Sequence, residues 1–156
     1  MCARQMPPRR PIRRRLFSMP DFAALATIHA GSFTHPRPWS EAELRDLAAA
    51  PGAVLRALPG GFVLGRVTLD EAELLTIAVD PAARRQGLGR RLMAAFYRGC
   101  TDLGAVTAYL EVAADNPAAR ALYEAEGWQT AGRRKGYYRS PEGVPVDAVV
   151  MTRPLS

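Results

Sequence analysis

The sequence predicts an α+β (mixed α/β) fold in which about four helices flank a central, mostly antiparallel mixed sheet of about six or seven strands. Three consecutive segments, residues 53–58, 61–69 and 72–80, are rich in Val, Leu and Ile and are separated by short turns. Such a series is typical of an antiparallel meander. A helical pattern then leads to another strand-like segment at residues 105–113, which predicts one strand–helix–strand crossover in the middle of the sheet.

Length and composition indicate one ordinary globular domain. A chain of 156 residues can bury one sizeable core. Its residues are 48% apolar and 23% charged, which excludes disordered, fibrous and membrane classes for the chain as a whole.

The net charge of +6 is concentrated at the start of the chain. The first fifteen residues contain six arginines, three prolines and no acidic residue, whereas the rest of the chain balances 15 basic against 15 acidic side chains. We therefore expect residues 1–15 to form a disordered basic arm and residues 16–156 to form the folded domain. The arm either aids solubility or binds a polyanion such as RNA, and nucleic acid is expected only through this arm.

Cysteine usage points to a reduced, cytoplasmic protein. Cys2 lies in the arm and Cys100 near the end of a predicted helix, so a structural disulfide is not expected. No apolar run approaches the roughly 20 residues of a membrane helix. The segment after the arm is too interrupted for a signal peptide, and no membrane partner is expected.

Two helices are predicted before the meander. Apolar residues at helical spacing indicate the first over residues 20–33. The second is expected from Ser40 to about residues 51–52, because Ser40 and Glu43 have the spacing of a capping box. His29, within the first helix, and His35 are expected to be structural, and a place near the acceptor is the alternative for His35.

The helix of the crossover has an apolar face formed by Leu88, Leu92 and Phe96 and is expected to end near Gly99 or Gly104. The strand at residues 105–113 that follows is expected to be largely buried, because apolar residues dominate both of its faces.

The last part of the chain predicts one more helix and two strands. In the segment DNPAARALYEAEGW, Asn116 is a good N-cap, Pro117 suits the first helical position and Gly127 suits the stop. Residues 128–138 and 147–155 then have the composition of strands.

The segment ARRQGLGRRLMAAF, residues 83–96, follows a predicted strand and begins a helix. A first helical turn has N–H groups without internal partners, and Gly87 and Gly89 leave that backbone open to an anion such as a phosphate. The spacing fits neither a P-loop nor a dinucleotide fingerprint, so on spacing alone an ordinary basic turn stays an alternative.

Two longer segments, LLTIAVDPAARRQGLGRRLM and YLEVAADNPAARALYEAEGW, resemble the acetyl-CoA signature of the GNAT superfamily of N-acetyltransferases. The resemblance covers about residues 18–154. Within the superfamily, IHAGSFTHPRPWS and RRKGYY followed by DAVVM are similar to the RimI-type ribosomal-protein-alanine N-acetyltransferases.

The resemblance implies a site for acetyl-CoA as co-substrate, with no metal. The strand that contains Ile77, Ala78 and Val79 would splay from its neighbour, and its free backbone groups would pair with the pantetheine arm. Asn116 would lie near the pantetheine, although a role as N-cap alone is also sufficient. The loop around the pyrophosphate would consist of Arg84, Arg85, Gln86, Gly87, Leu88, Gly89 and Arg90.

The resemblance also implies the catalytic residues. Glu111 would take the proton from the attacking amine, through water, and Tyr123 would protonate the leaving thiolate of CoA. A protonated amine has no lone pair, so a base is required before it attacks the thioester. Direct transfer in a ternary complex depends on positioning both substrates. The alternatives are a polar residue at a strand end for Glu111 and a core residue for Tyr123.

The acceptor implied by the resemblance is the N-terminal alanine of a small-subunit ribosomal protein, held by His35, Trp39, Tyr137 and Tyr138. An α-amine has a pKa near 8 and lysine one near 10.4, so the α-amine is more than about a hundredfold richer in free base near neutral pH. Acetylation of a lysine or of a small-molecule amine is the alternative. A non-catalytic CoA-binding or RNA-binding module is a more remote one.

Overall fold

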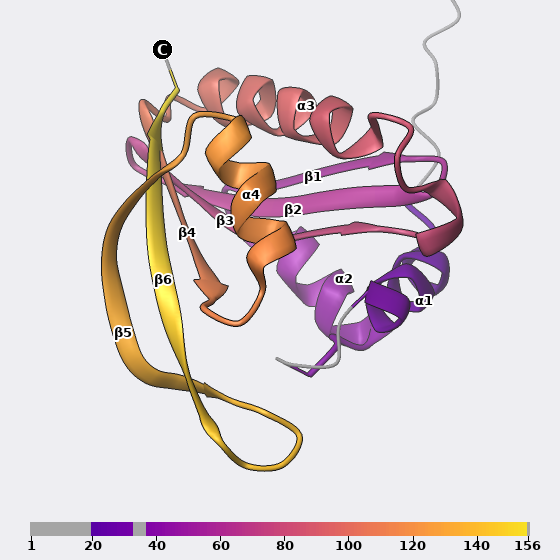
Figure 1. The fold of residues 1–156 in the computed structure, drawn as a ribbon. Coiled ribbons are helices and arrows are strands. Elements are labelled where there is room, and N and C mark those ends of the chain that lie inside the picture. Colours follow the sequence, from indigo (N-terminus) through magenta and orange to yellow (C-terminus); the bar gives the residue numbers. More distant parts are fainter. Residues whose placement is uncertain (1–19, 33–36, 156) are drawn as a thin grey trace, which may run out of the picture.

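A computed structural model describes residues 20–32 and 37–155. The expected arm at residues 1–15, Cys2 and His35 lie outside the described residues. The described residues form a six-stranded sheet in the order β1-β2-β3-β4-β6-β5 with four α-helices around it (Figure 1). Every neighbouring pair of strands is antiparallel except β3 and β4, which are parallel.

The elements follow one another in the predicted order, which confirms the expected fold class and the single crossover. In chain order they are α1 (Phe22–Ser32), α2 (Glu41–Ala49), β1 (Ala53–Leu58), β2 (Gly61–Thr68), β3 (Glu71–Val79), the 3-10 helix η1 (Pro81–Ala83), α3 (Leu88–Asp102), β4 (Thr107–Ala113), α4 (Pro117–Ala125), β5 (Gln129–Arg139) and β6 (Pro145–Pro154).

The predicted helix ends are largely confirmed. Ser40 caps α2, and its hydroxyl accepts a hydrogen bond from the N–H of Glu43 at 3.2 Å. Asn116 caps α4 in the same way, with its side chain accepting from the N–H of Ala119 at 3.2 Å. Of the two stops considered for α3, Gly104 is the one used, because it has a φ of 90° just after the helix.

The prediction that β4 is largely buried agrees with the structure, but burial is unequal on its two faces. Ala108, Leu110 and Val112 are buried, whereas Tyr109 and Glu111 between them are only partly buried. Apolar composition alone did not reveal this alternation, because Tyr109 counts as apolar although it is only partly buried. Glu111 therefore lies on the more accessible face of the sheet.

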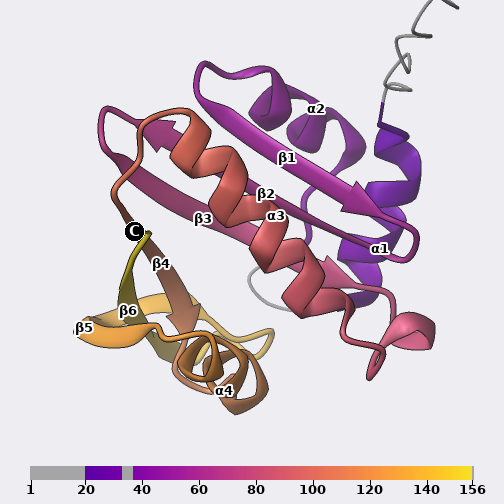
Figure 2. The same cartoon turned by 90° about the horizontal axis from the view of Figure 1, so that it is seen from above.

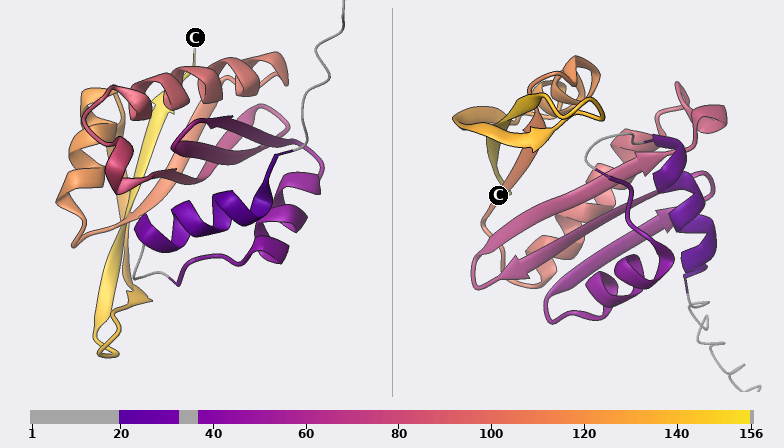
Figure 3. Two further views of the ribbon diagram at one scale, coloured as in Figure 1. Left: turned by 90° about the vertical axis from the view of Figure 1, so that its right-hand side faces the viewer. Right: turned by 90° about the horizontal axis from the view of Figure 1, so that it is seen from below.

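Helices cover both faces of the first three strands. Figure 2 shows α3 across β1, β2 and β3, and Figure 3 shows α1 and α2 on the opposite face. The larger core lies on the α3 side and includes Phe96, which is fully buried, and Tyr123 of α4. The smaller core lies on the α1 and α2 side around Phe62 and Leu44.

A β-bulge separates two halves of β3. Leu64 of β2 pairs with Thr76, but the next residue, Gly65, pairs with Leu74, so Leu75 is an extra residue. The parallel pairing of β3 with β4 also ends at Leu74, opposite Leu110. A bulge bends and twists its strand. The bend therefore coincides with the place where β3 and β4 part, which confirms the expected splayed pair.

The position on β2 opposite the bulge is occupied by Gly65, and no side chain fits there. A Cβ atom on Gly65 would be 2.3 Å from the ring of Phe96 and 2.6 Å from the carbonyl oxygen of Glu73. The ring of Phe96 therefore packs directly on the backbone of β2 opposite the bulge, which fixes α3 relative to β2.

His29 joins α1 to β3. Its side chain is buried, and its Nε2 is 3.1 Å from the hydroxyl of Thr76 while its Nδ1 accepts from the backbone N–H of Trp39 at 3.1 Å. Burial lowers the pKa of His29 from 6.5 to about 4. The expectation that His29 is structural agrees with these contacts.

Replacing Gly65 by alanine is expected to destabilise the fold by about 2 kcal/mol or more, because the added methyl group overpacks the contact with Phe96. Urea unfolding at neutral pH measures this change. Gly132→Ala in β5 is the matched control, because a Cβ there meets nothing within 4 Å. Equal stability of the two variants would contradict the packing argument.

Acid is expected to destabilise the protein through His29. The folded-state pKa lies below that of the unfolded chain, so this contribution is fully present above pH 6.5 and is lost as the pH falls toward 4. Between pH 7 and 4.5 the loss is about 2 to 3 kcal/mol. Urea unfolding at both pH values should show that His29→Phe removes this part of the pH dependence. An unchanged pH dependence in the variant would count against it.

Candidate active site

A cavity of about 470 Å³ opens where β3 and β4 part, and the end of α1, the start of α3 and α4 complete its walls. Its lining includes most of the site residues expected from the sequence. These are Trp39, Ile77, Ala78, Val79, Arg84, Arg85, Gly87, Leu88, Gly89, Glu111, Asn116, Tyr123 and Tyr138. Gln86, Arg90 and Tyr137 are exposed and are not part of the lining, and His35 lies outside the described residues.

The second half of β3 forms one wall of the cavity. Its pairing with β2 continues to Val79, whereas its pairing with β4 ends at Leu74. The carbonyl oxygen of Val79 accepts from the hydroxyl of Ser32 at 3.2 Å and from Nε of Arg84 at 3.4 Å. One edge of this half-strand thus faces the cavity in place of a neighbouring strand.

The loop between β3 and α3 has the backbone of an anion cradle. Arg85 and Gly87 both have positive φ angles, 64° and 73°. A left-handed conformation is strained for arginine, and strain of this kind concentrates at functional sites. Gly87 is the N-cap of α3 without any side-chain cap, so the first N–H groups of the helix are left for a ligand. A Cβ on Gly89 would have no neighbour closer than 3.9 Å, so the approach is open.

Glu111 carries its carboxylate into the cavity from β4. Its side chain is 17% exposed and forms an ion pair with Arg134 of β5, at 2.9 Å between Oε1 and Nε. The guanidinium group of Arg134 also lies over the ring of Tyr137, 5.4 Å from its centroid. Sequence reasoning missed Arg134, because the pairing of β5 with β6 and of β6 with β4 brings it to Glu111 across the sheet.

The paired tyrosines lie beside Glu111. Their rings meet edge to face at 5.0 Å, and the hydroxyl of Tyr138 is 3.5 Å from the carbonyl oxygen of Glu111. Burial, together with the charge of Glu111, raises the pKa of Tyr138 to about 12. The charge of Glu111 is the main cause of the raised pKa of the more exposed Tyr137.

Tyr123 of α4 reaches the cavity from the face of β4 that carries Leu110 and Val112, opposite to the face that carries Glu111. Its ring packs against Trp128 with centroids 6.0 Å apart, and 8% of the residue is exposed. Burial raises the pKa of Tyr123 well above its ordinary value, so the phenol keeps its proton at neutral pH. The geometry is compatible both with a core residue and with a proton donor at the cavity.

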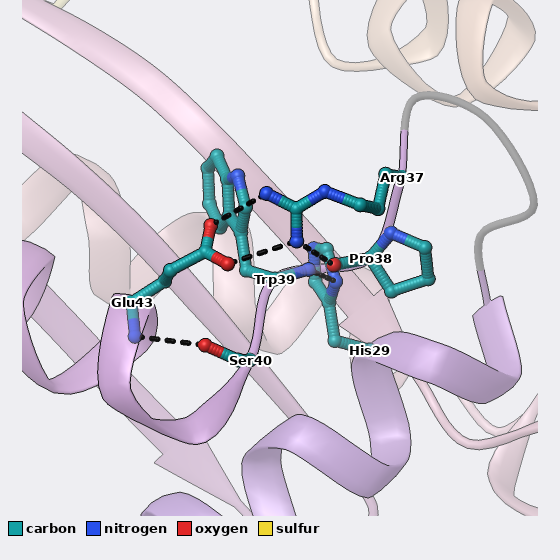
Figure 4. A network of polar contacts seen from close by, with 6 residues as sticks. All are labelled: His29, Arg37, Pro38, Trp39, Ser40 and Glu43. Atoms are coloured by element: carbon teal, nitrogen blue, oxygen red, sulfur yellow. Dashed lines mark hydrogen bonds and ion pairs between the residues drawn. The ribbon is translucent and has the colours of Figure 1, made fainter.

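A polar cluster forms the wall contributed by α1 and the segment before α2 (Figure 4). The ring of His29 stacks on that of Trp39 with centroids 5.3 Å apart and planes 6° apart. Arg37 donates to both carboxylate oxygens of Glu43, at 2.8 and 3.2 Å, and this contact lowers the pKa of Glu43. Arg37, His29 and Ser32 line the cavity although the sequence did not single them out as site residues.

The described part of the chain also bears on metal binding, cysteine reactivity and membrane spanning. No group of three or more His, Cys, Asp or Glu side chains there could hold a metal ion. Cys100 is free and buried, and burial raises the pKa of its thiol to about 12. None of the described helices has the length and apolar character needed to cross a membrane.

Comparison with known proteins connects this geometry to a family. Residues 22–128 match the Acetyltransferase (GNAT) family. The chain is 38% identical over 135 residues to the ribosomal protein bS18-alanine N-acetyltransferase of Escherichia coli K12, which covers 84% of this chain and 90% of that protein. It is 40% identical over 131 residues to the N-alpha-acetyltransferase RimI of Mycobacterium tuberculosis, covering 76% of this chain and 79% of that protein.

The fold agrees with this relationship. The crystal structure of the ribosomal-protein-S18-alanine N-acetyltransferase from Escherichia coli matches with a TM-score of 0.75 at 36% identity, covering 87% of this chain and 88% of that one. The chain therefore belongs to the GNAT acetyltransferase family and is an acetyl-CoA-dependent acyltransferase.

Proposed function

We propose that this enzyme acetylates the N-terminal α-amine of a protein, in particular an N-terminal alanine of a small-subunit ribosomal protein, by direct transfer from acetyl-CoA. The observation that carries the proposal is that Glu111, Tyr123 and the backbone cradle at Gly87 line one cavity. Relatives named as ribosomal protein bS18-alanine N-acetyltransferases support the choice of acceptor.

In this proposal, different walls of the cavity bind different parts of acetyl-CoA. The N–H groups of residues 87–90 bind the pyrophosphate, because a helix N-terminus favours an anion, and Arg84 and Arg85 add positive charge. The unpaired edge of residues 77–79 hydrogen-bonds the pantetheine as an added strand would. Asn116 caps α4 and also borders the pantetheine path, since it lines the cavity.

The chemistry follows from the two proton-transfer groups. Glu111 accepts a proton from the acceptor ammonium, directly or through water, and the freed amine attacks the thioester carbonyl carbon. The C–S bond of the tetrahedral intermediate then breaks, and Tyr123 donates its proton to the departing sulfur. The nitrogen releases its second proton to solvent, Tyr123 regains a proton from solvent, and Glu111 releases the proton that it took, so that one proton is set free in each turnover. The products are the N-acetylated protein and CoA, without an acyl-enzyme.

The acceptor enters, in the same proposal, between the segment 37–39 and the paired tyrosines. Trp39 and Tyr138 line the cavity, and Tyr137 stands beside it with half of its surface exposed. A flexible N-terminus fits aromatic walls of this kind, and its lower pKa makes it the easier nucleophile. Acetylation of a lysine or of a small amine is the alternative.

Two broader expectations remain part of the proposal. Residues 16–156 form the catalytic domain and residues 1–15 an accessory arm, through which any nucleic-acid contact would occur. Cytoplasmic residence fits an enzyme whose acceptor is a ribosomal protein.

Replacing Gly87 by valine is expected to weaken acetyl-CoA binding by about tenfold or more, because a β-branched residue resists the positive φ and the cradle distorts. Titration calorimetry with acetyl-CoA measures this. Arg91→Ala, an exposed arginine of α3 outside the cavity lining, is the matched control and should bind within about twofold of the parent. The reverse ranking would contradict the assignment of the cradle to the backbone.

Glu111→Gln and Tyr123→Phe are each expected to lower kcat by about a hundredfold, the usual contribution of a general acid or base. The assay follows thiol release and peptide mass with an alanine-led peptide as acceptor. Glu71→Gln on β3 and Tyr109→Phe on β4, both outside the cavity lining, should retain near-parental rates.

Competition between acceptors tests the proposed substrate. The alanine-led peptide should be acetylated faster than the same peptide with a blocked N-terminus and an internal lysine, and faster than a polyamine. Preference for lysine or the polyamine would overturn the acceptor assignment. If none of the three acceptors causes thiol release, the enzymatic proposal is overturned.

A further inference from the structure

We propose that His29 is a positioning residue for acetyl transfer, which fixes the acceptor-side segment 37–39 to the half of β3 that carries acetyl-CoA. The inference rests on the proposed function, because that function places the acceptor beside Trp39. His29 touches neither substrate in this account. It acts through Trp39 on one side and through Thr76 on the other.

The hydrogen bonds of His29 run in one direction from the loop to the strand. The backbone N–H of Trp39 can only donate, so Nδ1 of His29 is the acceptor of the 3.1 Å bond. Nε2 of the neutral ring then carries the proton and donates to the hydroxyl of Thr76, also at 3.1 Å. The ring is neutral at physiological pH, because burial lowers the pKa of His29 to about 4.

The imidazole is also held by packing. Trp39 stacks on the ring, and Phe62 of β2 packs at a tilt of 39° with centroids 6.1 Å apart. Segment 37–39 has a second attachment, the two hydrogen bonds from Arg37 to Glu43 of α2, as Figure 4 shows. That attachment is exposed, whereas the bond from His29 to Thr76 is buried and the bond from Trp39 to His29 is partly buried. The buried link is therefore the stiffer of the two.

Thr76 is the first residue after the bulged Leu75, and Ile77 to Val79 follow it directly. The side chain of His29 thus connects the strand residues proposed to bind pantetheine with the segment proposed to bind the acceptor. Loss of that link should loosen the acceptor wall while the pyrophosphate cradle, on the other side of β3, keeps its geometry. Acceptor affinity should suffer more than acetyl-CoA affinity or the rate of the chemical step.

Thr76→Val tests the link without changing the shape of the strand. We expect the KM for the alanine-led peptide to rise by about tenfold, the effect of losing one buried hydrogen bond. The kcat value and the dissociation constant for acetyl-CoA should change less than about twofold. His29→Phe should reproduce this pattern, and Thr76→Ser, which keeps the hydroxyl, should restore the parental KM. Thr27→Val, an exposed change on α1, should leave all three values unchanged.

Tryptophan fluorescence gives a readout that needs no acceptor. Acetyl-CoA binding should shift the Trp39 emission in the parent, a signal identified by its loss in Trp39→Phe, and the shift should disappear in Thr76→Val. An unchanged acceptor KM together with an unchanged fluorescence response would overturn the inference. A lowered thermal stability with unchanged kinetics and fluorescence would also overturn it, because His29 would then serve the fold alone.

Failure of the proposed function gives a different pattern. If the parent enzyme acetylates lysine or a polyamine instead of the peptide, the α-amine proposal fails. The KM for that other acceptor and the fluorescence response then test His29 independently.

Discussion

The parting of β3 and β4 is the constraint on which the rest of the site depends. Their parallel pairing ends at Leu74 and Leu110, and beyond that point the middle of the sheet is open. Backbone groups left without partners in a protein interior cost about 1 to 3 kcal/mol each. An extended ligand rich in amides satisfies such groups as a neighbouring strand would. The open centre of the sheet therefore offers the strand edge at which we propose that the pantetheine of acetyl-CoA binds.

The bulge at Leu75 determines what surrounds this opening. Ahead of it, Ala72 and Leu74 face the core under α3, and after it Ile77 and Val79 pack against that same core. An extra residue shifts the alternation of a strand by one position. As a result Thr76 turns toward α1, where His29 reaches its hydroxyl. One inserted residue thus opens the cavity on the side of β4 and builds the polar contact on the side of α1.

Sequence patterns predicted the elements better than the details that shape the cavity. Caps such as Ser40 and Asn116 are local signals, and the structure confirms both. The bulge depends on how β2 and β3 pair, and the Arg134 contact depends on strands that are neighbours only through β6. No local pattern encodes either. Most of the expected lining came from motif resemblance, because the residues of the glycine loop and of β4 meet only in the folded chain.

The ion pair between Glu111 and Arg134 positions the carboxylate of Glu111 but is weak enough to break. Arg134 is 58% exposed, so the pair contributes little to the stability of the fold and its cation can leave at small cost. In the proposed reaction, the acceptor ammonium would bring a positive charge to the same carboxylate. The ring of Tyr137, already packed under the guanidinium group, offers a cation a second favourable surface beside Glu111. In the proposed reaction, exchange of Arg134 for the acceptor ammonium would keep the charge of Glu111 balanced as the acceptor binds.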